Sequence, residues 1–293
     1  IEIEHNSYND DLGNLLWDKS VFNDNSEIDL IIGGSRVCTF NLNISFIQNI
    51  LDNKCVEYKN KLLIELFDFN TFNNGLGLTN YKSKYHEKQL LYKKTTVDNG
   101  YSYKIIAEGK HIPFNIQDNY VTDRSIEKPF VESSISTRYL VESNKQFDVT
   151  DNFLLVCQFA ILKIIHHNLN DGLNTHKPII NSIALKVQCE NDKFSNYKYW
   201  YYEDLIKLSI LGDDIYIFCF DPLLKNSKNF TKYLNNDYNC NNISGVSFSR
   251  YKKIFITLDV DQPNNKILNI SLSSCCMNML VQHLDMIGCR FVR

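Results

Sequence analysis

Apolar and polar residues alternate along much of this sequence with the period of two that is typical of β-strands. In 251–260, Ile254, Ile256 and Leu258 occupy every second position, and 215–220 is a continuous apolar run that predicts a fully buried strand. The same reasoning predicts further strands over 28–32, 37–46, 61–67, 101–106, 179–187 and 267–272. The sequence therefore predicts an all-β protein.

Turn residues between these strands indicate how some of them are connected. Gly33-Gly34 separates 28–32 from 37–46, which predicts a hairpin, and the turn at 261–265 predicts that 251–260 and 267–272 pair antiparallel. The stretch 107–150 is polar and contains two prolines, so we expect long connections there. The aromatic stretch 197–202 is expected to lie at the edge of a sheet.

The run 153–165 has the length of a helix, but its apolar residues also fit a strand that is buried on both faces. We predict a strand. The Asn- and Gly-rich stretch 168–174 follows it and predicts a domain boundary near residue 172. The expected organisation is a first domain over 1–172 and a second over 173–293.

Composition narrows the classes of function that the chain could have. The 293 residues suffice for two small β domains. The net charge of −3 offers no broad basic surface, so direct binding to nucleic acid is not expected. Nine cysteines without a CxxC pair indicate reduced, mostly buried thiols of an intracellular protein. No apolar run is long enough to predict a membrane span. Because the sequence does not start with Met, we expect it to begin inside a longer chain.

A nucleotidyltransferase site is one chemical reading of Gly33-Gly34-Ser35, because such a turn after a strand presents backbone amides to phosphates. That chemistry also needs two nearby carboxylates to hold metal ions, and none follows Ser35. Asp259 and Asp261 lie far along the chain. The glycines are better explained as a turn between two strands.

Other candidate groups also have simpler explanations. Adjacent histidines such as His166 and His167 point to opposite faces of a strand, so we do not expect them to bind one metal ion together with His176. Asp213-Asp214 fits a turn before a strand, and 244–248 lacks the Gly-x-Ser-x-Gly pattern of a serine nucleophile. We therefore expect no catalytic residue, no metal and no cofactor.

The C-terminal third carries a resemblance to a known family. The run 215–220, then Ser244-Gly245-Val246-Ser247-Phe248-Ser249-Arg250, a strand, a turn, a second strand and Asn278-x-Leu280 resemble the end of double jelly-roll major capsid proteins of large nucleocytoplasmic DNA viruses. Gly288 lies where the family has a Gly-containing tail. In the first half, 28–32 with Gly33-Gly34 resembles a strand and turn of the family's first roll, and 153–165 resembles the strand that closes that roll.

The resemblance implies two antiparallel jelly-roll sandwiches side by side, of which the first lacks its opening strands in this shorter chain. It implies that Gly33, Gly34 and Gly245 are turn residues and that Phe248 anchors its turn in the core. Arg250 is expected to form a structural ion pair or to bind backbone carbonyl groups.

The function implied by this resemblance is that of a non-enzymatic capsid protein. Three copies are expected to form a homotrimeric capsomer that contacts neighbouring capsomers or minor capsid proteins, above an underlying viral membrane. The implied location is the virion, after assembly in the host cell cytoplasm.

Two alternatives from other classes stay open. A secreted or surface jelly-roll binding module of the lectin type would be favoured by disulfides and by glycosylation at the Asn-x-Ser/Thr positions Asn43, Asn229, Asn242 and Asn269. A nucleotidyltransferase-like enzyme would require Mg²⁺-dependent binding of a nucleoside triphosphate.

Overall fold

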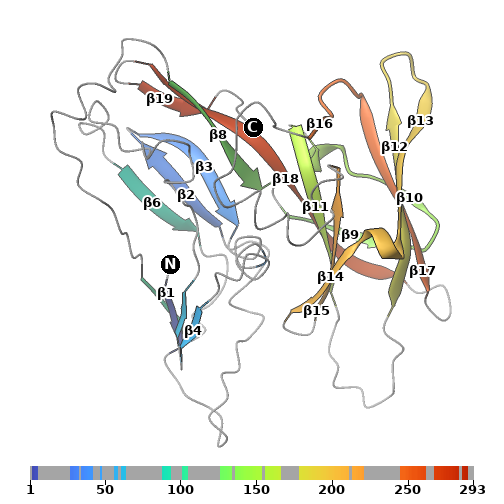
Figure 1. Ribbon diagram of the computed structural model, residues 1–293, viewed down its shortest axis with the longest axis horizontal. Helices are drawn as coiled ribbons and strands as arrows, with labels where there is room; N and C mark the ends of the chain where they lie inside the picture. The colour runs from blue at the N-terminus through green and yellow to red at the C-terminus, as the bar shows by residue number, and fades with distance from the viewer. Residues whose placement is uncertain are drawn as a thin grey trace, which may run out of the picture. The chain divides into compact units, whose positions relative to one another are not determined.

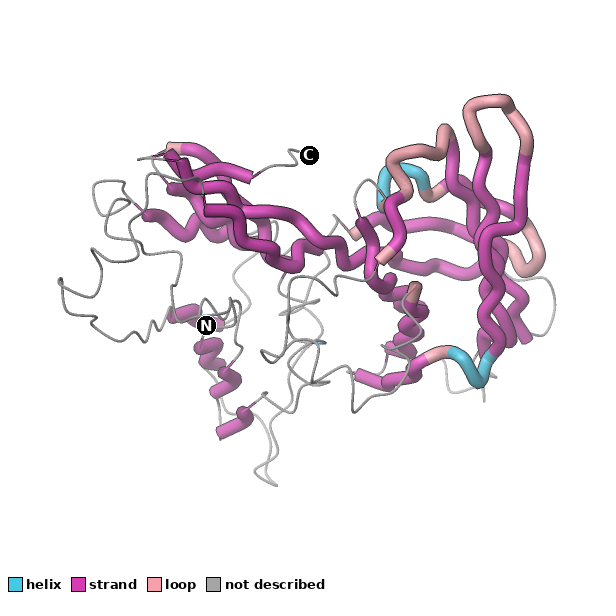
Figure 2. The backbone as a smooth tube through the Cα atoms, turned by 45° about the horizontal axis from the view of Figure 1, so that its top comes forward, coloured by secondary structure: helices cyan, strands magenta, loops and turns pink. Residues whose placement is uncertain are grey.

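The chain is almost entirely β-structure wherever the computed structural model describes it (Figure 1). The described residues are 2–5, 27–32, 34–41, 47, 56–58, 61–63, 88–93, 101–104, 126–133, 136–153, 156–165, 178–210, 213–220, 245–261, 267–283 and 286–289. Figure 2 shows strands throughout, with short 3-10 helices at η2 (Thr150–Asn152) and η3 (Tyr202–Asp204). The predicted all-β class is confirmed.

Contacts divide the chain into two compact units, which we describe separately. Unit 1 comprises 1–132, 230–243 and 278–292, and unit 2 comprises 133–229 and 244–277 together with Arg293. The predicted boundary, residue 172, lies outside the described residues. The strands on either side of it, over 156–164 and 179–188, both belong to unit 2.

Unit 2 is a sandwich of two antiparallel sheets. Its strands are β9 (Thr137–Val141), β10 (Gln146–Asp148), β11 (Val156–Ile164), β12 (Ile179–Gln188), β13 (Phe194–Tyr201), β14 (Ile206–Ile210), β15 (Asp213–Cys219), β16 (Val246–Ser247), β17 (Lys253–Asp261) and the part of β18 (Leu268–His283) up to Met277. One sheet has the order β10-β17-β12-β13. In the other, β14, β15, β11 and β18 are neighbours in that order, β9 pairs with β18, and β16 pairs with β11.

The order in which these strands pair identifies unit 2 as a jelly roll. The early strands β9, β10, β11 and β12 pair with β18, β17, β15 and β13, so the second half of the unit folds back over the first in reverse order. The β11·β18 and β12·β17 pairs then join these ribbons into two sheets. Eight antiparallel strands that roll up in this way form two Greek keys, which is the jelly-roll arrangement.

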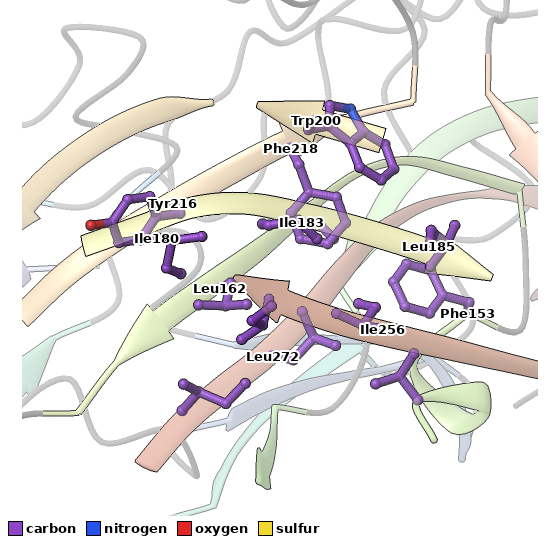
Figure 3. Close-up of a cluster of buried hydrophobic side chains, with 14 of the residues drawn as sticks. Phe153, Leu162, Ile180, Ile183, Leu185, Trp200, Tyr216, Phe218, Ile256 and Leu272 are labelled. Atoms are coloured by element: carbon purple, nitrogen blue, oxygen red, sulfur yellow. The ribbon is translucent and has the colours of Figure 1, made fainter. Parts of the chain in front are cut away.

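The core of unit 2 lies between its two sheets. Figure 3 shows side chains from both sheets meeting in one apolar layer, among them Leu162 of β11, Leu272 of β18 and Ile183 of β12. Trp200 ties the sheets together, because its indole Nε1 donates a hydrogen bond of 2.9 Å to the carbonyl oxygen of Cys219. This bond satisfies the polar atom of an otherwise buried ring.

Asn152 at η2 is a polar member of this core. Its side-chain Nδ2 donates to the carbonyl oxygen of Leu272 at 3.1 Å and to Thr137 Oγ1 at 3.2 Å, and its Oδ1 accepts from Tyr139 Oη at 2.6 Å. Ser274 Oγ donates to the backbone carbonyl of Asn152. A buried amide with this many partners holds η2 against β9 and β18.

The second face of the β11 sheet is buried as well. Phe159, Ile161, Ile215 and Ile217 point away from the core between the sheets, and each is at most 3% exposed. An antiparallel sheet with one solvated face alternates apolar and polar residues, and the central strands β11 and β15 do not. The prediction that 153–165 contains a strand buried on both faces is confirmed by β11.

Unit 1 contains shorter strands. They are β1 (Glu2–His5), β2 (Glu27–Ile32), β3 (Ser35–Asn41), β4 (Val56–Tyr58), β5 (Lys61–Leu63), β6 (Lys88–Lys93), β7 (Tyr101–Lys104), β8 (Ile126–Ser133, its last residue apart), β19 (Met286–Cys289) and the end of β18. They form the sheets β4-β5-β1-β7 and β3-β2-β6, while β8 and β19 pair with β18.

Three expectations about connections need correction. The strands β17 and β18 lie in different sheets of unit 2 and are not partners, because the last two strands of a jelly roll belong to opposite sheets. The stretch 107–150 holds β8, β9 and β10 in addition to connections. The strand β11 pairs with β15 and β18 within unit 2, so it does not close an N-terminal roll.

Candidate assembly surface

Large aromatic side chains are exposed along β13, which lies at one edge of the β10-β17-β12-β13 sheet among the described strands. Phe194 is 58% exposed, Tyr199 is 49% exposed and Tyr201 is 60% exposed. We call these three residues the β13 aromatic surface. An edge strand offers unpaired backbone groups, and exposed aromatic residues add apolar area and hydroxyl groups that suit contact with another molecule.

A bulge brings these three residues onto one face of the sheet. The register between β12 and β13 shifts between Leu185 and Lys186, and the shift reverses which side chains point outward. On one side of it Phe194 lies opposite Gln188, and on the other Tyr199 lies opposite Ala184. The even-numbered Phe194 and the odd-numbered tyrosines therefore share the outer face, while Trp200 points into the core.

Contacts within the sheet hold these rings in place. The ring centroids of Tyr199 and Tyr201 are 4.8 Å apart, and Tyr199 Oη shares a hydrogen bond of 2.8 Å with Ser182 Oγ. The ring of Phe194 lies 5.8 Å from that of Phe255 on β17. The surface is therefore built from ordered side chains of neighbouring strands.

A lysine contacts the aromatic residue that directly follows this surface in sequence. Lys207 is on β14, and Tyr202 is the first residue of η3. Lys207 Nζ is 3.4 Å from the ring centroid of Tyr202, and it also donates to the carbonyl oxygen of Tyr202 at 3.2 Å. A cation above an aromatic ring is attracted to the negative face of the ring in a cation–π interaction. Tyr202 is 40% exposed, so the pair is open to solvent.

Three of the sequence-predicted positions, Phe248, Ser249 and Arg250, lie in the turn between β16 and β17, and Gly245 directly precedes β16. A Cβ atom on Gly245 would lie 2.8 Å from Val156 Cγ1 and 3.1 Å from the carbonyl oxygen of Cys157, so only glycine lets β16 pair closely with β11. Ser249 Oγ lies 3.0 Å from Ser247 Oγ in the same turn. Ser244, next to this turn, lies outside the described residues.

Phe248 points from this turn into the core and is 1% exposed. Its ring centroid lies 5.1 Å from that of Phe220, 5.3 Å from Phe153 and 5.5 Å from Tyr197. The pKa of Tyr197 is raised, mainly because the side chain is partly buried and also because a negative charge on Tyr251 opposes its ionisation. The positive charge of Arg250 lowers this pKa and offsets part of the rise.

Arg250 is exposed, and its guanidinium carbon lies 5.0 Å from the ring centroid of Tyr251. Among the described residues it has no carboxylate or carbonyl partner. The expected ion pair or carbonyl contact is therefore not seen among the described residues. Arg250 instead stacks on the ring of Tyr251.

The other predicted positions lie in unit 1. Gly34 has a φ of 80° in the turn between β2 and β3, a conformation that favours glycine, and the predicted hairpin is confirmed. Asn278 is a buried residue of β18, and Gly288 in β19 lies opposite Val281. Gly33 lies outside the described residues. The seven described positions of these nine are thus divided between unit 1 and unit 2.

Candidate catalytic or metal-binding groups gain no support from the described part of the chain. Within it, no group of three or more His, Cys, Asp or Glu side chains could hold a metal ion. Asp213 and Asp214 are the first residues of β15, while His166, His167 and His176 lie outside the described residues. The helices described are too short to cross a membrane.

The β13 aromatic surface was predicted only in part. The aromatic stretch 197–202 predicted a sheet edge, and the position of β13 confirms it. Phe194 was missed, because its side of the sheet depends on the bulge opposite Leu185 and Lys186. Alternation read along one strand contains no signal for such a bulge.

Two solved structures are similar to the whole chain. One is the quasi-atomic model of the PBCV-1 virus capsid, with a TM-score of 0.61 and 12% identity over 100% of this chain and 88% of that one. The other is PBCV-1 VP54 fitted into a reconstruction of the virophage Sputnik, with a TM-score of 0.62, 12% identity and the same coverage. No protein-family model and no curated protein matches the sequence. The fold is therefore similar to that of double jelly-roll capsid proteins.

Proposed function

We propose that this chain is a structural protein of a viral capsid, in which copies of it assemble into trimeric capsomers of the shell of a double-stranded DNA virus. The observation that carries the proposal is a jelly roll with one sheet buried on both faces, in a chain whose fold is similar over its full length to a capsid protein.

The β13 aromatic surface is the contact we propose between copies. Aromatic residues are enriched at the centres of protein interfaces, and an edge strand can add backbone hydrogen bonds to a partner. Neighbouring capsomers and minor capsid proteins are the further partners we propose, at a location in the virion after assembly in the host cytoplasm. The function needs no catalytic group.

The test is the mass of the purified chain by light scattering, beside two matched variants. The expected mass is three times the 34.2 kDa protomer. Tyr201→Lys introduces a charge on the β13 aromatic surface, and we expect it to release protomers. Leu140→Lys introduces the same charge at a residue of β9 that is 76% exposed, and we expect it to leave the trimer intact.

The outcomes separate the two parts of the proposal. A wild-type chain that stays a protomer at every concentration would contradict self-assembly. A trimer that persists in Tyr201→Lys would instead show that the copies meet elsewhere.

A lectin-like binding module is the second candidate, and the exposed rings of Tyr199 and Tyr201 favour it because sugars stack on such rings. It predicts a protomer that binds oligosaccharides with a saturable affinity, and loss of this binding in Tyr201→Lys. A glycan-binding screen beside the light-scattering measurement distinguishes the two functions.

A further inference from the structure

Two cysteines far apart in sequence meet in the core of unit 2. Cys157 on β11 and Cys276 on β18 lie directly opposite each other in the antiparallel pair, and their Sγ atoms are 2.9 Å apart. Both side chains are 0% exposed and belong to the same apolar cluster between the sheets. Both are present as thiols.

The backbone geometry at this pair suits a disulfide bond. Residues directly opposite in an antiparallel pair have Cα atoms about 4.5 to 5.5 Å apart, within the range of about 4.4 to 6.8 Å found for disulfides. An S–S bond of about 2.0 Å requires the two sulfur atoms to approach by only about 0.9 Å more. Small rotations of the two side chains supply that movement without displacing either strand.

A hydroxyl group lies beside the pair. Ser274 Oγ donates its proton to the carbonyl oxygen of Asn152 and lies 3.2 Å from Cys276 Sγ. The two sulfur atoms are already in contact in the reduced state.

Cys189, Cys219 and Cys275 cannot substitute for either partner. Cys275 and Cys219 lie on the opposite face of the same sheet, on the strands to either side of Phe159. Two strand spacings amount to about 9.6 Å, which is too far for a disulfide. Cys189 lies in the turn between β12 and β13, where it exchanges backbone hydrogen bonds with Asp192 and Lys193.

We propose that Cys157 and Cys276 are a site of oxidative cross-linking that joins β11 to β18. The oxidant is a small disulfide of the oxidised glutathione class. The thiolate of one cysteine attacks it and releases one glutathione thiol, and the second thiolate then attacks the mixed disulfide and releases the other. Two thiols of the chain thus become one disulfide, and their two electrons and two protons end on the two glutathione thiols that are released.

Burial determines when this reaction takes place. Fully buried thiols do not meet an oxidant, so the mixed disulfide forms during folding, before β18 closes on β11, and the second thiolate attacks it as the two strands pair. Once formed, the same burial protects it from reductants. The bond closes a loop between residues 119 positions apart and ties together the central strands of the sheet.

The test refolds the full chain from denaturant in a buffer of reduced and oxidised glutathione, in which every thiol is accessible at the start. After alkylation and digestion, mass spectrometry should find the Cys157 and Cys276 peptides joined. We expect the midpoint of thermal unfolding to lie roughly 5 to 15 °C above that of the chain refolded with a reductant.

Two variants act as controls. Cys275→Ala removes the neighbouring thiol on the other face and should leave the linked peptides unchanged. Cys276→Ala should abolish both the linked peptides and the dependence of the melting midpoint on oxidation. Refolded wild-type chain in which both cysteines are alkylated, or carry only glutathione, would overturn the proposal even if its fold is intact.

Discussion

Phe248 offers the sharpest test of the sandwich architecture. Its side chain is 1% exposed and its ring packs against three other aromatic rings at 5.1 to 5.5 Å. Truncation of a buried phenylalanine to alanine costs about 3 to 5 kcal/mol, because apolar area is exposed and a cavity is left. We therefore expect Phe248→Ala to lower the free energy of unfolding by about 4 kcal/mol and the melting midpoint by roughly 8 to 16 °C.

The assay is urea unfolding followed by circular dichroism, with Leu140→Ala as the control at the same protein concentration. Leu140 is 76% exposed and lies outside the β13 aromatic surface, so its truncation should cost no more than about 1 kcal/mol. A loss at Phe248 below about 1.5 kcal/mol, or equal losses at both positions, would refute the assignment of Phe248 to the core.

Further predictions concern the turn before β17 and the charge at β10. Gly245→Ala should destabilise the fold by about 1 to 3 kcal/mol in the same urea assay, because the added Cβ meets Val156 Cγ1 at 2.8 Å; an unchanged midpoint would contradict the close approach of β16 to β11. Arg250→Ala should change the free energy of unfolding by less than about 1 kcal/mol, since its contact is an exposed stacking one, and a larger loss would reveal a further partner. Burial opposes ionisation of Asp148, but hydrogen bonds from Thr150 outweigh it and lower the pKa of this carboxyl. Asp148→Asn should therefore be less stable than wild type above about pH 5, and the difference should vanish as pH falls through the lowered pKa; a difference that is constant from pH 2 to pH 7 would contradict this.

The sequence predicted the individual strands of unit 2 better than their partners. The alternation in 251–260 and the apolar run 215–220 correspond to β17 and β15, since burial in a sheet leaves a direct trace in residue order. The predicted partner of β17 was wrong, because alternation indicates which residues face the core but not which strand pairs with β17. In a jelly roll the partners of β17 are β10 and β12, both far away in sequence.

The same limit applies to the features that we connect with function. The β13 aromatic surface depends on a bulge that only the register reveals, and the Cys157–Cys276 pair joins residues whose spacing in sequence matches no known motif. Short strands such as β9 and β10 were missed in 107–150, because three to five residues with mixed polarity carry too weak a periodicity.

Electron microscopy of the purified chain tests self-assembly into capsomers most directly. Class averages should show particles with three-fold symmetry and a pseudo-hexagonal outline of six lobes, two from each of three copies. Particles the size of one protomer at every concentration, without three-fold symmetry, would contradict the proposed function.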